Sequence, residues 1–143
     1  MTTAASAQVL ALGELAPGRQ AVVEFSVTAL QMRQFAELSG DFNPLHTDDA
    51  FARAKGFDGV VVYGALIVAK VSQLIGMQLP GRDSVWASVA LEFRKPLHVD
   101  QVAQVEGVVT EVSASTGMVV LKLTVRAAGK LLAKGTAEVV LGR

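Results

Sequence analysis

The sequence of 143 residues contains no cysteine, so thiolate nucleophiles, disulfides and cysteine-containing zinc sites are excluded. Its two histidines, His46 and His98, are too few for a histidine-rich metal site, and we predict no metal. Basic residues are not in excess either, because 13 Lys and Arg balance 13 Asp and Glu. Since the affinity for nucleic acid depends largely on positive charge, we predict neither DNA nor RNA as a partner.

Long apolar runs are also missing. The longest one extends from Gly59 to Ala69, whereas a membrane-spanning helix needs about 20 apolar residues. Residues 1–15 contain no Lys or Arg, and a secretory signal would carry such a charge before its hydrophobic run. These two absences predict a protein without membrane association, located in the cytoplasm.

The remaining composition is that of a folded, apolar chain. Hydrophobic residues make up 51% and charged residues only 18%, which excludes a disordered chain. A length of 143 residues suits one domain of ordinary size, so we predict a single domain over residues 1–143. So much apolar surface also predicts self-association.

Capping and turn signals predict the first elements. Residues 20–27 have the apolar pattern of a strand. Thr28 and Gln31 then form the Thr-x-x-Gln pattern of a capping box. Gly40 suits the left-handed end of a helix. Together these signals predict a helix over about residues 29–39.

The rest of the chain predicts one long helix and several strands. A short helix is expected first, with Thr47 or Asp48 as its cap. Residues 65–77 form a helical pattern that is apolar on nearly every side, so this helix must be buried. From Ser84 onward the apolar period changes to two, which is typical of strands. Further strand-like runs cover roughly residues 99–112, 117–127 and 130–141. We therefore predict an α+β domain in which a curved antiparallel sheet wraps around one long central helix.

One polar cluster stands out in a chain that lacks G-x-G-x-x-G, P-loop, G-x-S-x-G and H-E-x-x-H signatures. It is SGDFNPLH, residues 39–46, which places Asp41 and His46 five positions apart. A carboxylate and an imidazole that share one water form a general acid–base pair. Pro44 favours an extended Asn43, which can turn both side chains toward one cleft. The alternative is structural: Asp41 caps a turn, Asn43 closes an Asx turn and His46 packs locally.

Two stretches resemble the MaoC-like, (R)-specific enoyl-CoA hydratase family: FAELSGDFNPLHTDDAFA and GFDGVVVYGALIVAKVSQLIGMQLPG. The resemblance covers nearly all of the chain after about residue 20, and it implies a hot dog fold. It also implies that Asp41 and His46 are the catalytic pair. In the family such a pair holds a water that adds to the β-carbon of a trans-2-enoyl thioester, while a proton reaches the α-carbon. Which of the two is the base stays open. Asn43 resembles the supporting amide of the motif, with an Asx turn as its structural alternative.

The start of the predicted long helix resembles the substrate site of the same family. Addition to an enoyl thioester builds negative charge on the thioester oxygen, which amides at a helix N-terminus can stabilise. The resemblance implies this role for Gly64, although a glycine there can also simply relieve crowding. Tyr63 stands where close relatives often have His, and we include it among the substrate-binding positions. Ser72 is expected to project into apolar surroundings. It either matches a Ser that some relatives place beside the pair, or bonds the carbonyl four residues earlier. His98 is expected to be an exposed loop residue.

These observations together predict a hydro-lyase. The expected reaction is the reversible hydration of trans-2-enoyl-CoA to (R)-3-hydroxyacyl-CoA, with the coenzyme A thioester as substrate and no metal or redox cofactor. One alternative is a 3-hydroxyacyl-[acyl carrier protein] dehydratase, and another is a non-catalytic hot dog subunit that binds an acyl thioester. Thioester hydrolysis is less favoured. The resemblance further implies a homodimer whose sheets join edge to edge.

Overall fold

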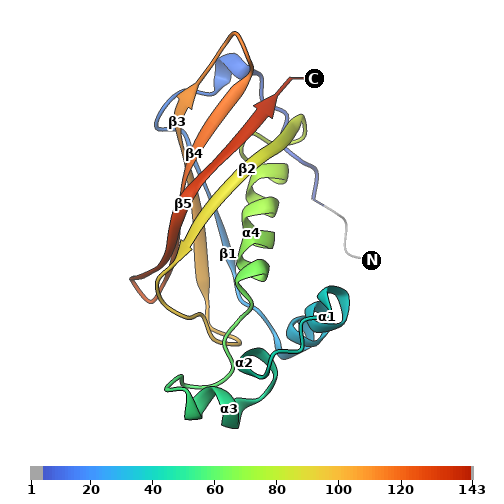
Figure 1. Cartoon of the computed structure of the whole chain (residues 1–143). Coiled ribbons are helices and arrows are strands. Elements are labelled where there is room, and N and C mark those ends of the chain that lie inside the picture. The colour runs from blue at the N-terminus through green and yellow to red at the C-terminus, as the bar shows by residue number, and fades with distance from the viewer. Residues whose placement is uncertain (1–4, 143) are drawn as a thin grey trace.

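Five antiparallel strands form one curved sheet in the computed structural model, which describes residues 5–142. The strands are β1 Gln20–Phe25, β2 Ser84–Phe93, β3 Ala103–Val112, β4 Met118–Ala127 and β5 Lys130–Leu141. They lie in the order β1–β3–β4–β5–β2, so β1 and β2 are the two edges (Figure 1). All neighbours pair in the antiparallel sense, as the sequence predicts.

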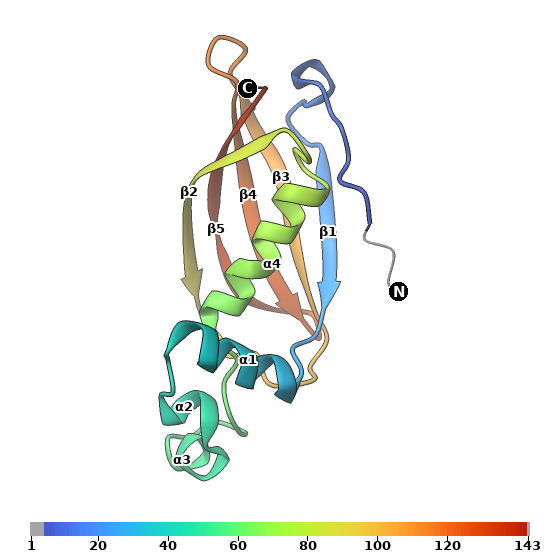
Figure 2. The ribbon, with the colours of Figure 1, turned by 90° about the vertical axis from the view of Figure 1, so that its right-hand side faces the viewer.

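The helices lie on one face and at one end of this sheet. They are α1 Ala29–Ser39, α2 Pro44–Thr47, α3 Asp49–Ala54 and α4 Gly64–Met77, and a 3₁₀ helix covers Leu12–Glu14. Figure 2 shows α4 crossing the face of the sheet, with α1, α2 and α3 gathered below its N-terminal end. A sheet curved around one long helix confirms the predicted α+β class.

The central strands alternate strictly between a dry face and a wet face. In β4, Leu121, Leu123 and Val125 are fully buried. Lys122 and Arg126, which alternate with them, are exposed on the opposite face. This alternation gives the sheet one apolar face, which α4 covers.

The first helix has the boundaries that its capping signals predict. The Thr28 hydroxyl accepts the Gln31 N–H at 3.1 Å, and the Gln31 side-chain oxygen accepts the Thr28 N–H at 3.0 Å. Gly40 ends the helix with a left-handed φ of 77°. Asp48 caps α3 by accepting the Phe51 N–H at 3.2 Å, which confirms the second of the two caps considered.

The long helix lies very close to the sheet. A Cβ atom on Gly107 of β3 would lie 2.9 Å from a methyl carbon of Leu74, so any larger residue there would force Leu74 to shift. The prediction that α4 is buried on every side is wrong for a single chain, because one stripe of the helix is not covered by the sheet. The exposed residues of this stripe are Ala65, Ala69, Ser72 and Gln73. Within residues 5–142, no helix is long and apolar enough to cross a membrane.

Candidate active site

The segment between α1 and α2 is folded by its own short side chains. Asp41 accepts the Asn43 N–H at 3.0 Å through Oδ1, and Asn43 accepts the Leu45 N–H at 2.9 Å through its own Oδ1. Asn43 thereby caps α2, with Pro44 at the first helical position. The Asx turns considered as the structural alternative are therefore present. They leave the second carboxylate oxygen of the exposed Asp41 without a partner among the described residues.

The imidazole of His46 is oriented by a backbone carbonyl. His46 is half-buried, and its Nδ1 lies 2.6 Å from the Val61 carbonyl oxygen. Because a carbonyl can only accept, Nδ1 must carry the proton, and Nε2 of the neutral ring is then an acceptor. Val61 is itself anchored, since its N–H donates to the Leu45 carbonyl at 3.0 Å. The local fold thus fixes both the tautomer and the direction of the ring.

His98 also supports this segment, which corrects the expectation of an exposed loop residue. It is half-buried, and its Nδ1 donates to the Val60 carbonyl oxygen at 3.0 Å. Next to it, the Val62 N–H donates to the Leu97 carbonyl at 2.8 Å. The role of His98 is therefore to hold the strand-like stretch against which His46 is placed.

Tyr63 connects Asp41 to His46. Its hydroxyl donates to the Asp41 carbonyl oxygen at 2.6 Å, and its ring stacks on the His46 ring with centroids 4.1 Å apart. Phe35 of α1 packs on the Tyr63 ring with a centroid distance of 4.6 Å. Tyr63 is only 2% exposed, so the expected substrate contact does not fit its placement. Burial, and secondly the negative charge of Asp41, raise the pKa of the Tyr63 phenol above its ordinary value.

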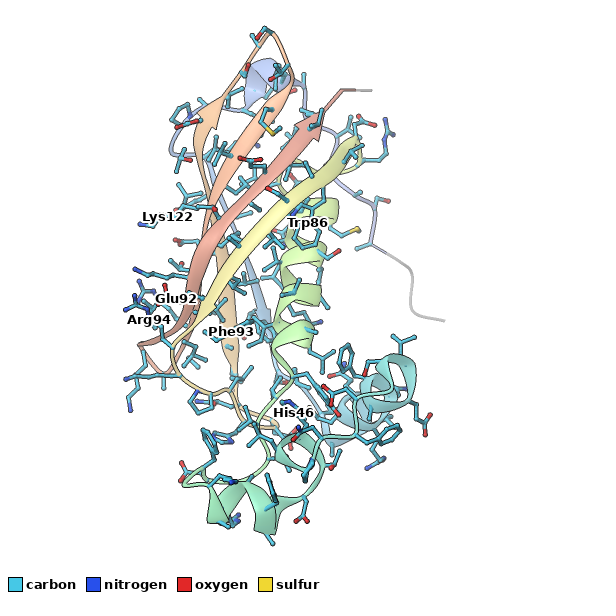
Figure 3. All side chains as sticks on the ribbon, viewed as in Figure 1. His46, Trp86, Glu92, Phe93, Arg94 and Lys122 are labelled. Atoms are coloured by element: carbon cyan, nitrogen blue, oxygen red, sulfur yellow. The ribbon has the colours of Figure 1, made fainter. Side chains whose placement is uncertain are left out.

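Gly64 and His46 line a common cavity of about 340 Å³. Gly64 begins α4, and the N–H groups of a first helical turn have no acceptor within the helix. Phe93 closes one side of this cavity, because a Cβ atom on Gly64 would lie 2.9 Å from its ring. Figure 3 shows His46 below the N-terminal end of α4, with Phe93 at the end of β2. Apolar residues form much of the remaining wall: Phe57, Val61, Val62, Ile67 and Leu97.

A second cavity, of about 350 Å³, reaches His46 from the side of α1. Its lining includes Met32, Arg33 and Phe42. Neither this cavity nor the first is lined by Asp41. The structure therefore brings His46 and Gly64 together in one cavity, and it links Asp41 to them through Tyr63.

Comparison with known proteins shows to which family this chain belongs. The family model for the MaoC like domain matches residues 14–130, which is most of the chain. The chain belongs to the MaoC-like family. The (R)-specific enoyl-CoA hydratase of Aeromonas caviae is 42% identical over 91 residues, covering 62% of this chain and 68% of that protein. A solved structure of an (R)-hydratase from A. caviae, involved in PHA biosynthesis, superimposes with a TM-score of 0.85 at 34% identity, covering 90% of this chain and 98% of that one.

A second relative of this MaoC-like chain is named for an acyl-carrier-protein substrate, whereas the A. caviae hydratase is named for a coenzyme A substrate. The mitochondrial 3-hydroxyacyl-[acyl-carrier-protein] dehydratase of Arabidopsis thaliana is 37% identical over 68 residues, covering 48% of this chain and 40% of that protein. Both named relatives add or remove water, and the MaoC-like chain is accordingly a hydro-lyase. The hot dog fold and the family predicted from the sequence are confirmed.

Ser72 does not lie beside the pair within one MaoC-like chain. It follows Gly64 by eight residues, which places it about 12 Å further along the helix axis. It is also exposed, so the expected apolar surroundings are absent in the single chain. Over residues 5–142, no three or more His, Asp or Glu side chains are grouped so that they could hold a metal ion.

Proposed function

We propose that this chain hydrates trans-2-enoyl-CoA reversibly to (R)-3-hydroxyacyl-CoA, with Asp41 and His46 as its acid–base pair. The observation that carries this proposal is the cavity that His46 and Gly64 share. It offers a proton acceptor and a helix N-terminus to the same small molecule, inside walls that are largely apolar. The similarity to an (R)-specific enoyl-CoA hydratase supports the choice of substrate.

The pair has the acceptors that one water needs. Nε2 of neutral His46 accepts one hydrogen bond, because Nδ1 is committed to the Val61 carbonyl. The Asp41 carboxylate accepts through the oxygen that the Asn43 N–H does not use. As the water oxygen bonds to C3 of the enoyl group, the pair takes one proton from the water and returns one proton to C2. It thus ends each turnover in its initial protonation state.

Gly64 is the proposed donor to the thioester oxygen. During addition the C1 carbonyl gains enolate character. A backbone N–H at the start of α4 can stabilise that negative charge without rearrangement, because the helix already holds it in place. Because Gly64 has no side chain, the Phe93 ring can lie directly against the start of α4, where it closes one side of the cavity. Asn43 supports the site by capping α2, which carries His46.

We propose that the protein acts as a homodimer in the cytoplasm, without a metal or redox cofactor. The uncovered stripe on α4 and the free edge of β2 are the surfaces that a second copy would cover. Ser72 belongs to that stripe, so we place it at the seam between subunits rather than next to the acid–base pair.

The first test follows the loss of enoyl absorbance when the protein is mixed with crotonyl-CoA, with chiral analysis of the product. We expect Asp41→Asn and His46→Ala each to lower kcat by about 10²–10⁴-fold, since each removes one half of the proton transfer. Asp58→Asn, at an exposed position in the loop after α3, is the matched control and should retain full activity. Normal rates in both site variants would reject the pair.

Three further measurements distinguish the remaining alternatives. Higher kcat/KM for the acyl carrier protein thioester would favour the carrier-protein dehydratase, which the Arabidopsis relative motivates. Release of free thiol, seen with a thiol-reactive dye, would indicate hydrolysis. Binding of the enoyl thioester without turnover would indicate a non-catalytic subunit.

A further inference from the structure

We propose that Tyr63 is a positioning residue, which holds the Asp41 backbone and the His46 ring in a single arrangement. The inference rests on the proposed function, because that function gives Asp41 and His46 their chemistry. It assigns Tyr63 no contact with substrate, in contrast to our expectation from the sequence.

Tyr63 uses two different parts of its side chain for the two contacts. The hydroxyl donates to the Asp41 carbonyl at 2.6 Å, and the ring face lies on the imidazole with an interplanar angle of 25°. Within the described residues, no hydrogen bond joins the Asp41 side chain to His46 directly. The phenol ring therefore provides the side-chain link between them, across 22 positions of sequence.

Tyr63 itself has little freedom to move. It is 2% exposed, and Phe35 packs on its ring. Tyr63 is the residue that precedes α4, so the helix fixes its backbone, and its hydroxyl donates to the Asp41 carbonyl. The next residue is Gly64, the proposed donor to the thioester oxygen. One rigid residue thus connects the positions of the acid–base pair and of the oxyanion donor.

Such a residue affects turnover rather than binding. A displacement of about 1 Å in a catalytic group costs up to about 10²-fold in rate. Tyr63→Phe keeps the stacked ring and removes only the hydrogen bond to Asp41. We expect it to lower kcat by about 10–100-fold while KM changes by less than about twofold.

A double-mutant cycle separates positioning from a general structural role. If Tyr63 acts through Asp41, Tyr63→Phe should change kcat by less than about twofold once Asp41→Asn is already present. A purely structural effect would instead multiply with that of Asp41→Asn. Val119→Ala, a fully buried change at the end of β4 away from Phe93 and the cavity, is the stability control and should lower the melting temperature without lowering kcat.

The contacts of Tyr63 can also be measured without any turnover. Because the chain has only two histidines, the ring protons of His46 are readily assigned by NMR with a His98→Gln variant. We expect these protons to be shifted upfield in the native protein and in Tyr63→Phe, and to lose the shift in Tyr63→Leu. If Tyr63→Phe does not fold, Tyr63→Leu and the Phe35→Leu variant, which loosens Tyr63 without removing it, provide the same comparison.

The outcomes for the two proposals are distinct. Hydration by the native protein, with Tyr63→Phe within about twofold of it in kcat, would overturn the positioning role and leave the proposed function in place. His46 protons without an upfield shift would overturn it as well. A native protein with the shift but without hydration would overturn the proposed function, and with it the catalytic meaning of the Tyr63 contacts.

Discussion

Tyr63 is the only tyrosine of the chain, so its ionisation can be followed by phenolate absorbance. Burial, and secondly the negative charge of Asp41, raise the pKa of its phenol above the ordinary value of 10.0. We expect the folded protein to show phenolate only at a pH higher than a free tyrosine requires. Asp41→Asn should lower this pKa part of the way, because burial remains as the larger cause.

The same shift in pKa predicts how stability changes at alkaline pH. The folded state holds the phenol proton more tightly than the unfolded state, so the contribution of Tyr63 to stability is complete below pH 10.0. It is lost as the pH rises through the pKa of the folded state. Asp58→Asn is the control for the titration and should leave the pKa of Tyr63 unchanged. Ionisation of Tyr63 at or below its ordinary pKa would contradict both expectations.

The site residues differ in how far the sequence alone could predict them. Asp41, Asn43 and His46 lie within one motif, so their closeness follows from chain connectivity and from the resemblance of that motif to a family. The hydroxyl bond of Tyr63 to Asp41 spans 22 positions, and no local pattern encodes a contact of that range. The half-buried His98 was missed for the same reason, since its partner is the Val60 carbonyl, 38 positions away.

Among the elements, the contact between α4 and β3 depends on one glycine. A Cβ atom on Gly107 would lie 2.9 Å from a methyl carbon of Leu74, so this fully buried side chain would have to shift within the core. We expect Gly107→Ala to cost about 1–3 kcal/mol, because it overpacks the core. For a chain of this length that corresponds to a fall of about 3–10 °C in melting temperature, measured by calorimetry.

Gly13→Ala is the matched control for this change. No atom lies within 4 Å of a Cβ atom at Gly13, and its φ is not in the left-handed region. We expect it to leave the melting temperature unchanged within about 2 °C. An equal loss of stability in both variants would show that helix and sheet do not approach as closely as described.

The bounds of the helices and strands were predicted well, whereas the exposure of their side chains was not where it depends on distant neighbours. The bounds of α1 follow from Thr28, Gln31 and Gly40, whose hydrogen bonds and φ angle are local. By contrast, β2 has a regular apolar period in sequence, yet most of its residues are exposed in the single chain. Its pairing with β5 is irregular between Trp86 and Ser88, and a bulge of this kind changes which side chains face the helix.

At the scale of the whole molecule, apolar surface remains uncovered along one side. On the edge strand β2, Val85 is 58% exposed, Val89 is 41% exposed and Phe93 is 50% exposed. The stripe of α4 that the sheet does not cover is a second surface left open in the single chain. An unpaired edge strand with exposed valines invites pairing with another strand. A second copy of the chain would bury both surfaces around a twofold axis.

This surface predicts a homodimer that forms through β2. Sedimentation should give twice the chain mass of 15.0 kDa. Val89→Lys places a charge on the β2 edge, and we expect it to shift the protein to the monomer mass, because pairing would bury that charge. Val22 of β1, at the opposite edge of the sheet, is 43% exposed and provides the matched control. Val22→Lys should remain dimeric. If Val22→Lys dissociates the protein and Val89→Lys does not, the subunits join through β1, and the stripe on α4 that carries Ser72 needs another explanation.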